Sequence, residues 1–450
     1  MNRIYLDYAA TTPINYEVKK AMGPYFSERF GNPNSLHYFG QQARRAIDES
    51  REKIAKSIGA DFGEIIFTGS ATEANNLALR GTIKAVQLFS DGTACPLAPA
   101  ASGRLGSRAD GSAFGRDQAR RHSETFRTKT TKRPYRIIVS GIEHESILET
   151  ARDLEREGVE VIYLAVNKNG IVDLKKLKNY LNDRTVLVSI MYANNEIGSI
   201  QPISEIGKII SEFKGGNIYP LFHTDAVQAF QFLNCNVDDL GVDLMTLSAH
   251  KIYGPKGIGA LYARQNNESR IMNNEIKKTI IHNSKFIIHP IITGGEQEFG
   301  LRSGTENAAA IVGFAKAVEL AAKNRDKEAK RILDLKNYFQ RGLNKIYSKA
   351  QINGQKITNY QSPITNLPNI INIYFPDFKS EDLLIKLDLN GIAVSSGSAC
   401  ASFSAKPSHV LEALGYKEER IKSSLRFSFG KFTKKSELDF ALKIIRIILK

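Results

Sequence analysis

The sequence predicts an α/β fold, with a large domain built on a mostly parallel sheet and a smaller α+β domain. Short apolar segments alternate with helical segments through the first two-thirds of the 450 residues, and such alternation is typical of a largely parallel sheet. From about residue 308 the pattern changes to one long helix followed by shorter mixed elements. We therefore place the large domain at 15–322 and the small domain at 1–14 and 323–450.

The large domain is expected to consist mostly of strands that alternate with helices. Short β-branched and aliphatic runs predict the strands, and longer amphipathic runs predict the helices between them. The expected strands are 65–68, 136–140, 159–164, 186–191, 218–224 and 244–247, and the expected helices are 72–88, 145–157, 173–181 and 203–213. Residues 91–133 are rich in Gly, Ala, Ser and Arg without any period, so we expect an exposed insertion there.

The small domain is expected to begin inside a long helix that runs from about 308 to 346. Its remaining elements are predicted as strands at 370–375, 392–395 and 424–429, helices at 381–387 and 408–414, and a C-terminal helix. The segment 265–289 is rich in Asn, Lys and Ile, and we expect an extended loop with a strand-like end. Because ligands bind outside the carboxyl ends of parallel strands, the polar motifs that follow strands are the candidate site.

Composition narrows the functional class. Hydrophobic residues make up 42% and charged residues 24% of the chain, which is ordinary for a globular protein. The net charge is +15, but basic and aromatic residues do not interleave, so we expect no direct nucleic-acid binding. No apolar run is long enough to cross a membrane, and the start of the chain lacks a secretory pattern. Three cysteines form no disulfide framework, which favours a cytoplasmic setting.

Two residues at predicted strand ends point to pyridoxal phosphate. Lys251 lies in a polar, glycine-flanked stretch, where a lysine can hold an aldehyde cofactor as a Schiff base. Asp225 ends an apolar strand and could pair with a protonated pyridine nitrogen, with Gln228 near the ring hydroxyl. Taken singly, each has a plainer explanation, because a lysine is usually a solvated surface residue and an aspartate often caps a turn.

Three further motifs are compatible with the same cofactor. The turn at 68–75 contains a glycine and opens a helix, a place that binds phosphate through backbone N–H groups, and Thr72 adds a hydroxyl. An ordinary N-cap explains that turn equally simply. His144 could stack on the cofactor ring and pass protons, or serve only as a structural hydrogen-bonding group. Asn195, in Asn-Asn-Glu-Ile-Gly, could touch both cofactor and substrate.

A cysteine and an arginine suggest chemistry on a sulfur-containing amino acid. Cys400 lies in a run of small polar residues, which argues against a buried, inert thiol and for a reactive one that reaches a substrate. Arg426 sits mid-strand among alternating apolar residues, where it needs a partner. A substrate carboxylate is a natural bidentate partner, and a structural salt bridge is the alternative.

These residues, in this order, resemble the cysteine desulfurase family, a group related to the class V aminotransferases that includes the housekeeping and nitrogen-fixation desulfurases. The resemblance runs over nearly the whole chain, and the Ser-Ser-Gly-Ser-Ala-Cys loop is similar to that of the long-loop subgroup. The motifs that carry it lie at 5–13, 30–33, 194–198, 248–257, 302–305, 395–400 and 426–430.

The resemblance implies a fold-type-I pyridoxal-phosphate enzyme that works as a homodimer. It implies that L-cysteine is converted to L-alanine and that a persulfide on Cys400 passes sulfur to an iron–sulfur scaffold or another acceptor, such as a tRNA-thiolation carrier. It assigns roles to the motif residues and no metal site. By this resemblance Lys251 holds the cofactor and moves the substrate proton. The phosphate region is held by Ala71, Thr72, Ser248 and His250, and Thr305 reaches the phosphate of the neighbouring subunit. The cofactor ring is surrounded by His144, Asn195, Asp225 and Gln228, and the substrate carboxylate is anchored by Arg426 with Asn195.

Three other functions stay open at the level of sequence. A relative that transaminates or cleaves another amino acid would keep Lys251 and Asp225, but it would not need Cys400 on a polar loop. Selenocysteine cleavage is a closer possibility as a side activity. A non-catalytic binding protein with the same fold would not need the full set of reactive residues.

Overall fold

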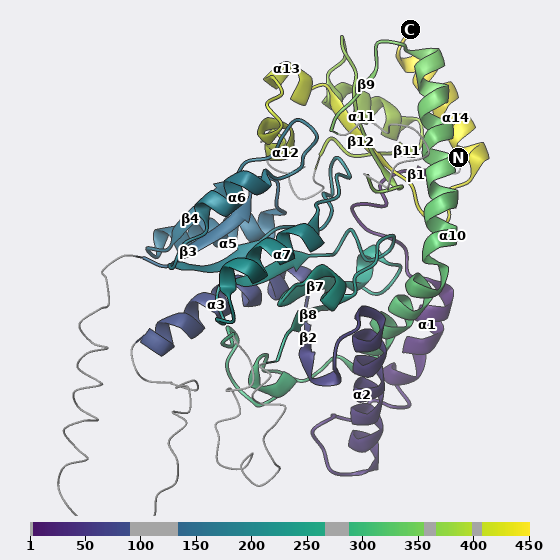
Figure 1. Cartoon of the computed structure of the whole chain (residues 1–450). Coiled ribbons are helices and arrows are strands. Elements are labelled where there is room, and N and C mark those ends of the chain that lie inside the picture. Colours follow the sequence, from purple (N-terminus) through teal and green to yellow (C-terminus); the bar gives the residue numbers. More distant parts are fainter. Residues whose placement is uncertain (1–2, 91–133, 266–287, 355–365, 398–406) are drawn as a thin grey trace, which may run out of the picture.

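The computed structural model describes residues 3–90, 134–265, 288–354, 366–397 and 407–450 (Figure 1). Its centre is a seven-stranded sheet in the order β2-β8-β7-β6-β5-β3-β4, in which only β8 runs against its neighbours. The strands are β2 (Ile65–Thr68), β3 (Arg136–Ser140), β4 (Glu160–Leu164), β5 (Thr185–Ser189), β6 (Leu221–Asp225), β7 (Leu244–Ser248) and β8 (Gly259–Ala263). The prediction of an α/β fold with a mostly parallel sheet is confirmed.

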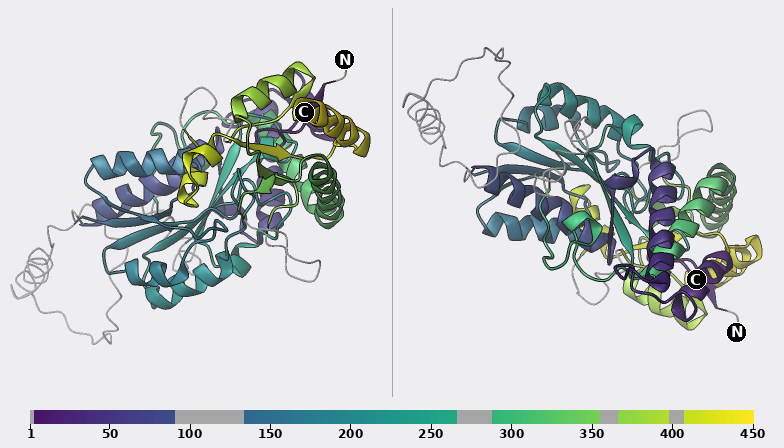
Figure 2. Two further views of the ribbon diagram at one scale, coloured as in Figure 1. Left: turned by 90° about the horizontal axis from the view of Figure 1, so that it is seen from above. Right: turned by 90° about the horizontal axis from the view of Figure 1, so that it is seen from below.

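Helices cover both faces of this sheet (Figure 2). Side chains alternate between faces along each strand, so in β3 Ile137 and Val139 join one apolar cluster and Ile138 joins the other. The first cluster is closed by α3 (Ala71–Ser90) and α5 (Glu145–Arg156), and the second by α6 (Leu174–Tyr180) and α7 (Ile203–Lys214). The sheet is therefore buried on both sides, and its edge at the carboxyl ends is left for a site.

The second part of the molecule has two small sheets, one of β12-β10-β9 and one of β1 paired with β11. The long helix α10 leads from the large sheet to these strands (Figure 1). The bounds are β1 (Ile4–Tyr5), α10 (Ala308–Ile346), β9 (Gln351–Ile352), β10 (Ile370–Tyr374), α11 (Ser380–Leu389), β11 (Ile392–Ala393), α12 (His409–Ala413), α13 (Glu418–Ile421), β12 (Ser424–Ser428) and α14 (Lys435–Ile448). The expected boundary at 322–323 falls within α10, and the division into domains stays a prediction.

The remaining elements are short helices and one long one that the sequence analysis did not assign. They are α1 (Tyr16–Met22), η1 (Gly23–Phe26), α2 (Tyr38–Ile58), η2 (Phe62–Glu64), α8 (Val237–Leu240), η3 (Ala249–Lys251) and η6 (Glu298–Gly300). The missed α2 is amphipathic and packs against α10.

One expected strand is shorter in the structure, and two expected loops lie wholly or mostly outside the described residues. The strand expected at 218–224 begins only at Leu221, directly after Pro220, because proline has no N–H to donate to a ladder. Residues 91–133 and most of 265–289 lie outside the described part of the chain. Among the described helices, none is long and apolar enough to cross a membrane.

A buried ion pair ties α2 to the edge of the large sheet. Arg51 of α2 and Glu298 of η6 are each about 1% exposed, with Nη2 to Oε1 at 2.6 Å. Glu298 Oε2 also accepts from the backbone N–H of Phe67 in β2 at 2.7 Å. Since both charges are removed from water, each depends on the other for compensation. This pair fixes the segment that leads on to Arg302 and Thr305.

We predict that Glu298→Gln lowers the free energy of unfolding by about 3 kcal/mol, because it leaves the Arg51 guanidinium buried without a counter-charge. Urea unfolding measures the change. Glu49→Gln is the matched control, since Glu49 pairs with Arg45 on the exposed face of the same helix, where such pairs contribute about 0.5 kcal/mol or less. Equal effects of the two substitutions would contradict this account of the buried pair.

Candidate active site

A single cavity of about 200 Å³ lies at the carboxyl edge of the large sheet. Its walls come from strand ends, from the first turn of α3 and from the N-terminal segment. Most residues singled out from the sequence line it, namely Ala71, Thr72, His144, Asn195, Asp225, Gln228, Ser248, His250, Lys251 and Arg426. Thr305 is exposed and is not part of the wall. Cys400 lies outside the described residues.

Lys251 enters the cavity from η3, the short turn that follows β7. Its Nζ donates to the backbone carbonyls of Ala9 at 2.6 Å and Ala10 at 2.7 Å. The N-terminal segment therefore directs the amine at the cavity. This segment is one of the motifs that carry the family resemblance, but the sequence suggests no role for it. Gln228 Nε2 donates to the same Ala9 carbonyl at 3.0 Å, so this carbonyl joins two of the expected site residues.

Asp225 ends β6 and is held by two donors. Its Oδ2 accepts from Asn75 Nδ2 at 2.9 Å, and its Oδ1 accepts from the backbone N–H of Val227 at 2.9 Å. The carboxylate is only 6% exposed. The two hydrogen bonds fix the orientation of the carboxylate at the cavity, where it can pair with a protonated ring nitrogen.

The first turn of α3 forms another wall of the cavity, contributed by Ser70, Ala71 and Thr72. The backbone of this turn lies against Gly259 of β8. A Cβ on Gly259 would lie 2.7 Å from the backbone carbon of Ser70 and 2.8 Å from the nitrogen of Ala71, so only glycine allows this approach. A helix start directed into a cavity favours an anion such as phosphate.

Thr305 is tied to that same helix start although it does not line the cavity. Arg302, three residues earlier, donates from Nε to Glu73 Oε1 at 2.9 Å. Glu73 belongs to the first turn of α3, and its other carboxylate oxygen accepts from Gly69 N at 2.9 Å. The exposed Thr305 therefore follows a segment anchored beside the expected phosphate position.

Two histidines in the wall are kept neutral. Burial lowers the pKa of His144, and the nearby Lys251 lowers it further, against a raising effect of Asp225. Burial likewise lowers the pKa of His250 to about 4. His144 Nδ1 accepts from the backbone N–H of Ser146 at 3.1 Å as the N-cap of α5, so the neutral ring carries its hydrogen on Nε2. His144 thus has both the structural role and a place in the cavity.

Arg426 of β12 is 1% exposed and forms a structural salt bridge, one of the two alternatives expected for it. Its Nη2 donates to Asp7 Oδ1 at 2.7 Å, which is a salt bridge, and its Nη1 donates to the carbonyl of Asn195 at 2.9 Å. Nε is buried and has no partner within the described residues. The guanidinium is therefore held in place at the cavity and retains a donor.

The two ends of the segment that contains Cys400 are fixed beside these residues. On the N-terminal side, Ser395 pairs with Arg426 through two backbone hydrogen bonds of 3.2 and 2.7 Å. On the C-terminal side, Ser408 Oγ donates to Glu196 Oε2 at 2.5 Å. Glu196 adjoins Asn195, so the described residues Ser395 and Ser408, one on each side of the Cys400 segment, lie near Arg426 and Asn195.

Sequence reasoning missed two side chains that hold the site together. Asn75 follows the turn at 68–72 by one helical turn of α3, so helical spacing could have placed it on the same face. Asp7 lies two residues after the end of β1 and reaches Arg426 only through the tertiary fold. Taken together, an amine, a buried carboxylate and a helix start surround one cavity. These groups fit an aromatic aldehyde that carries an anionic group.

Comparisons with known proteins agree with this assignment. The sequence matches the family described as Aminotransferase class-V over residues 4–93 and 124–440. It is 42% identical to the cysteine desulfurase IscS of Dictyoglomus turgidum over 446 residues, covering 99% of this chain and 94% of that relative. It is 38% identical to the putative cysteine desulfurase IscS 1 of Bacillus subtilis over 451 residues, covering 100% and 99%.

Solved structures give the same result. A NifS-like protein superposes with a TM-score of 0.76 at 33% identity, covering 99% of both chains. A structure described as SspA in complex with cysteine superposes with a TM-score of 0.70 at 30% identity, covering 96% of this chain and 100% of the other.

We predict that Asn75→Leu weakens pyridoxal-phosphate binding about tenfold or more, because a hydrogen bond to a buried carboxylate contributes roughly 1.5–3 kcal/mol. The change in affinity is measured by titrating the cofactor-free protein and following the absorbance of the bound cofactor. Asn76→Leu is the control, since its amide bonds to the carbonyl of Thr72 within the same helix. Unchanged affinity in Asn75→Leu would contradict the role given to Asn75.

Proposed function

Because the chain belongs to the aminotransferase class-V family, we propose that it is a pyridoxal-phosphate-dependent cysteine desulfurase. In this proposal it converts L-cysteine to L-alanine and passes the sulfur, through Cys400, to an iron–sulfur scaffold or another sulfur acceptor. The observation that carries the proposal is that Lys251, Asp225 and Arg426 line one cavity, and that both ends of the Cys400 segment are fixed beside it.

The cavity residues fit pyridoxal phosphate from three sides. The phosphate would lie at the start of α3, with Thr72, Ser248 and His250 near it, and Thr305 of the second subunit would complete this end. Asp225 would pair with the ring nitrogen. When bound, the cofactor supplies a carbonyl carbon that bonds an amine and a ring that withdraws electrons from the substrate.

Lys251 and His144 would handle the protons. The Lys251 amine projects into the cavity from a rigid turn, where two backbone carbonyls orient it, so it can remove the α-proton of a substrate held beside it. His144 is neutral and has its hydrogen on Nε2, so that nitrogen can donate to a neighbouring heteroatom. Lys251 belongs to η3 directly after β7, and His144 is the N-cap of α5, so short elements anchored to the sheet position both residues.

Arg426 and Asn195 would position the substrate. Asp7 and the Asn195 carbonyl hold Arg426, so its guanidinium group is already oriented before the substrate binds. Its buried Nε lacks a partner among the described residues, and a substrate carboxylate supplies one. A substrate anchored here would lie beside Ser395, which pairs with Arg426 and precedes the Cys400 segment.

Cys400 is the proposed sulfur acceptor. It follows the described Gly397 by three residues in sequence, in a segment whose flanking residues Ser395 and Ser408 are bonded to Arg426 and Glu196. Its thiolate would form an S–S bond with the substrate sulfur. The Cβ–S bond then breaks, its electron pair stays on carbon, and protonation of that carbon gives L-alanine.

We predict that Cys400→Ser keeps the yellow cofactor colour but releases no sulfide from L-cysteine under reductant, because only the thiol can take the sulfur. Lys251→Ala should lose the absorbance band of the lysine-bound cofactor. Cys235→Ala is the control, since Cys235 is fully buried and burial raises the pKa of its thiol to about 12, and it should keep sulfide release.

The assay is sulfide production combined with the absorbance spectrum of each purified variant. Full sulfide production by Cys400→Ser would contradict the role of Cys400, and a colourless wild-type protein that takes up no added cofactor would contradict the proposal as a whole.

We further propose that the protein works as a homodimer. The segment from α1 to the start of α2 exposes several large apolar side chains, with Leu36 91% exposed. Exposed apolar side chains concentrated in one segment are typical of an interaction site. The residues of this surface are Tyr16, Phe26, Phe30, Leu36 and Tyr38. The exposed Thr305, anchored beside α3, fits a residue that completes the phosphate site of a second copy.

We predict a dimer in solution that the double substitution Leu36→Asp and Tyr38→Asp converts to monomer, because two buried charges would oppose association. Light scattering after size-exclusion chromatography measures the mass. Leu389→Asp is the control, since Leu389 is 78% exposed on α11, away from this surface. A wild-type monomer, or a doubly substituted dimer, would contradict the proposed interface.

The composition supports a cytoplasmic location for this activity. Three cysteines in 450 residues are too few for the disulfide framework that proteins of oxidising compartments often have. A reactive Cys400 would also need reducing conditions to stay a thiol.

A further inference from the structure

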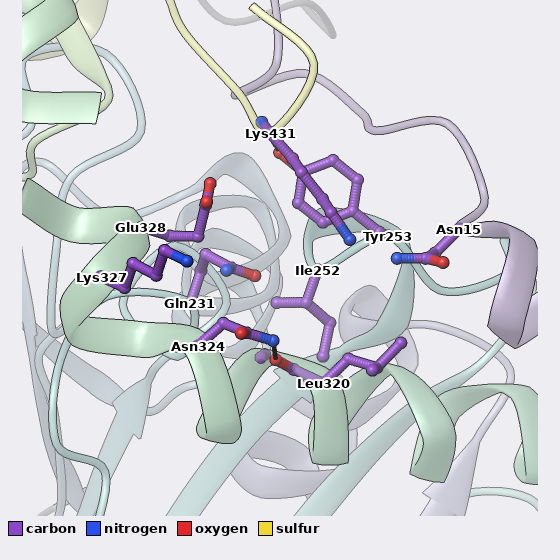
Figure 3. A pocket seen from close by; sticks show the side chains of 10 residues that line it. Asn15, Gln231, Ile252, Tyr253, Leu320, Asn324, Lys327, Glu328 and Lys431 are labelled. Atoms are coloured by element: carbon purple, nitrogen blue, oxygen red, sulfur yellow. Dashed lines mark hydrogen bonds between the residues drawn. The ribbon is translucent and has the colours of Figure 1, made fainter. Parts of the chain in front are cut away.

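A second cavity, of about 130 Å³, lies behind the lysine that the cofactor site uses. It shares no lining residue with the first cavity. Ile252 and Tyr253, which directly follow Lys251, form part of its wall, and the middle of α10 forms another part (Figure 3). At about 30 Å³ per water molecule, the space matches roughly four waters, so its occupant is small.

One polar side chain in this cavity is buried without a partner. Gln231 is 9% exposed, and its Oε1 has no hydrogen-bond partner within the described residues. The side-chain amide points into the cavity (Figure 3). A buried acceptor without a donor is destabilising, and a ligand that brings a donor removes that cost.

The charges around the cavity favour an anion. The amines of Lys327 and Lys431 both extend into the space (Figure 3), and neither has a carboxylate in ion-pair distance among the described residues. Glu328, the acidic residue of the wall, is already paired with Arg331 at 2.9 Å. Asn15 Oδ1 accepts from the backbone N–H of Glu17, which leaves the Nδ2 of this buried side chain as a donor.

The rest of the wall is apolar and firmly held. Ile252, Leu320 and Ala321 supply aliphatic surface. Tyr253 has a φ of 67°, a left-handed conformation that is uncommon for an aromatic residue. It is held there because its backbone N–H donates to Thr12 Oγ1 at 2.8 Å and its hydroxyl accepts from the backbone N–H of Lys431 at 2.6 Å.

We propose that this cavity is a second small-molecule site, which binds a short carboxylic acid bearing an α-hydroxyl or α-ammonium group. The carboxylate meets the amines of Lys327 and Lys431 and the amide of Asn15. The α-substituent donates to Gln231 Oε1, and a short aliphatic group rests on Ile252 and Leu320. The site is separate from the proposed reaction, and it holds whether or not the chain is a desulfurase.

L-lactate is the probe for the test, because it has the carboxylate, the donor and the methyl group but no amine that could react with the cofactor. We expect calorimetric titration of the cofactor-loaded protein to show one saturable site per chain in the millimolar range or tighter. Propionate lacks the α-donor, and we expect it to bind about tenfold more weakly.

Two substitutions locate the binding. Gln231→Leu should bring lactate down to the affinity of propionate and leave propionate unchanged, because only the hydroxyl uses Oε1. Lys431→Met should weaken both acids by about tenfold or more. Lys435→Met removes the same charge from the start of α14, where the lysine lies over the ring of Tyr338, and should leave both affinities unchanged.

Three results would overturn the proposal: no saturable lactate binding to the wild-type protein, equal affinities for lactate in wild type and Gln231→Leu, or equal losses in Lys431→Met and Lys435→Met. Competition by L-alanine against bound lactate then shows whether the ligand is an α-amino acid or an α-hydroxy acid. Displacement assigns amino acids to the site, and failure to displace assigns hydroxy acids.

Discussion

The parallel pairing of β6 with β7 is the constraint on which the site depends. Asp225 at the end of β6 pairs in register with Thr246 of β7, so both strands end at the same edge of the sheet. The carboxylate of Asp225 and the turn that carries Lys251 therefore enter the same cavity. The antiparallel β8 brings Gly259 back to Ser248 and against the start of α3. A slip of one residue would turn these side chains to the opposite face.

The N-terminal segment joins the two halves of the site. Its backbone carbonyls at Ala9 and Ala10 hold the Lys251 amine, while Asp7 holds Arg426 of the small sheet. The amine and the guanidinium are thus positioned by a stretch of only a few residues, one end of which pairs with β11. Such support from neighbouring groups is what keeps reacting side chains in a fixed geometry.

The two cavities lie on opposite sides of the same short turn. Lys251 faces the cofactor cavity, while Ile252 and Tyr253 face the cavity beside α10. Tyr253 has a left-handed backbone conformation, and its hydrogen bonds to Thr12 and Lys431 stabilise this conformation, which would otherwise cost roughly 1–3 kcal/mol. The long α10 contributes to the second cavity while also linking the large sheet to the small one.

The sequence by itself determined the α/β class, the bounds of α10 and the strand ends that carry Asp225 and Lys251, because apolar periodicity and strand-end polarity are local properties. It did not reveal α2, the antiparallel β8, the short β1 and β9, or the roles of Asn75 and Asp7. Only the tertiary structure decided that Asp7 meets Arg426, 419 residues away, and that Gln231 is buried without a donor. Such contacts depend on which distant segments pack together, and no local pattern records them.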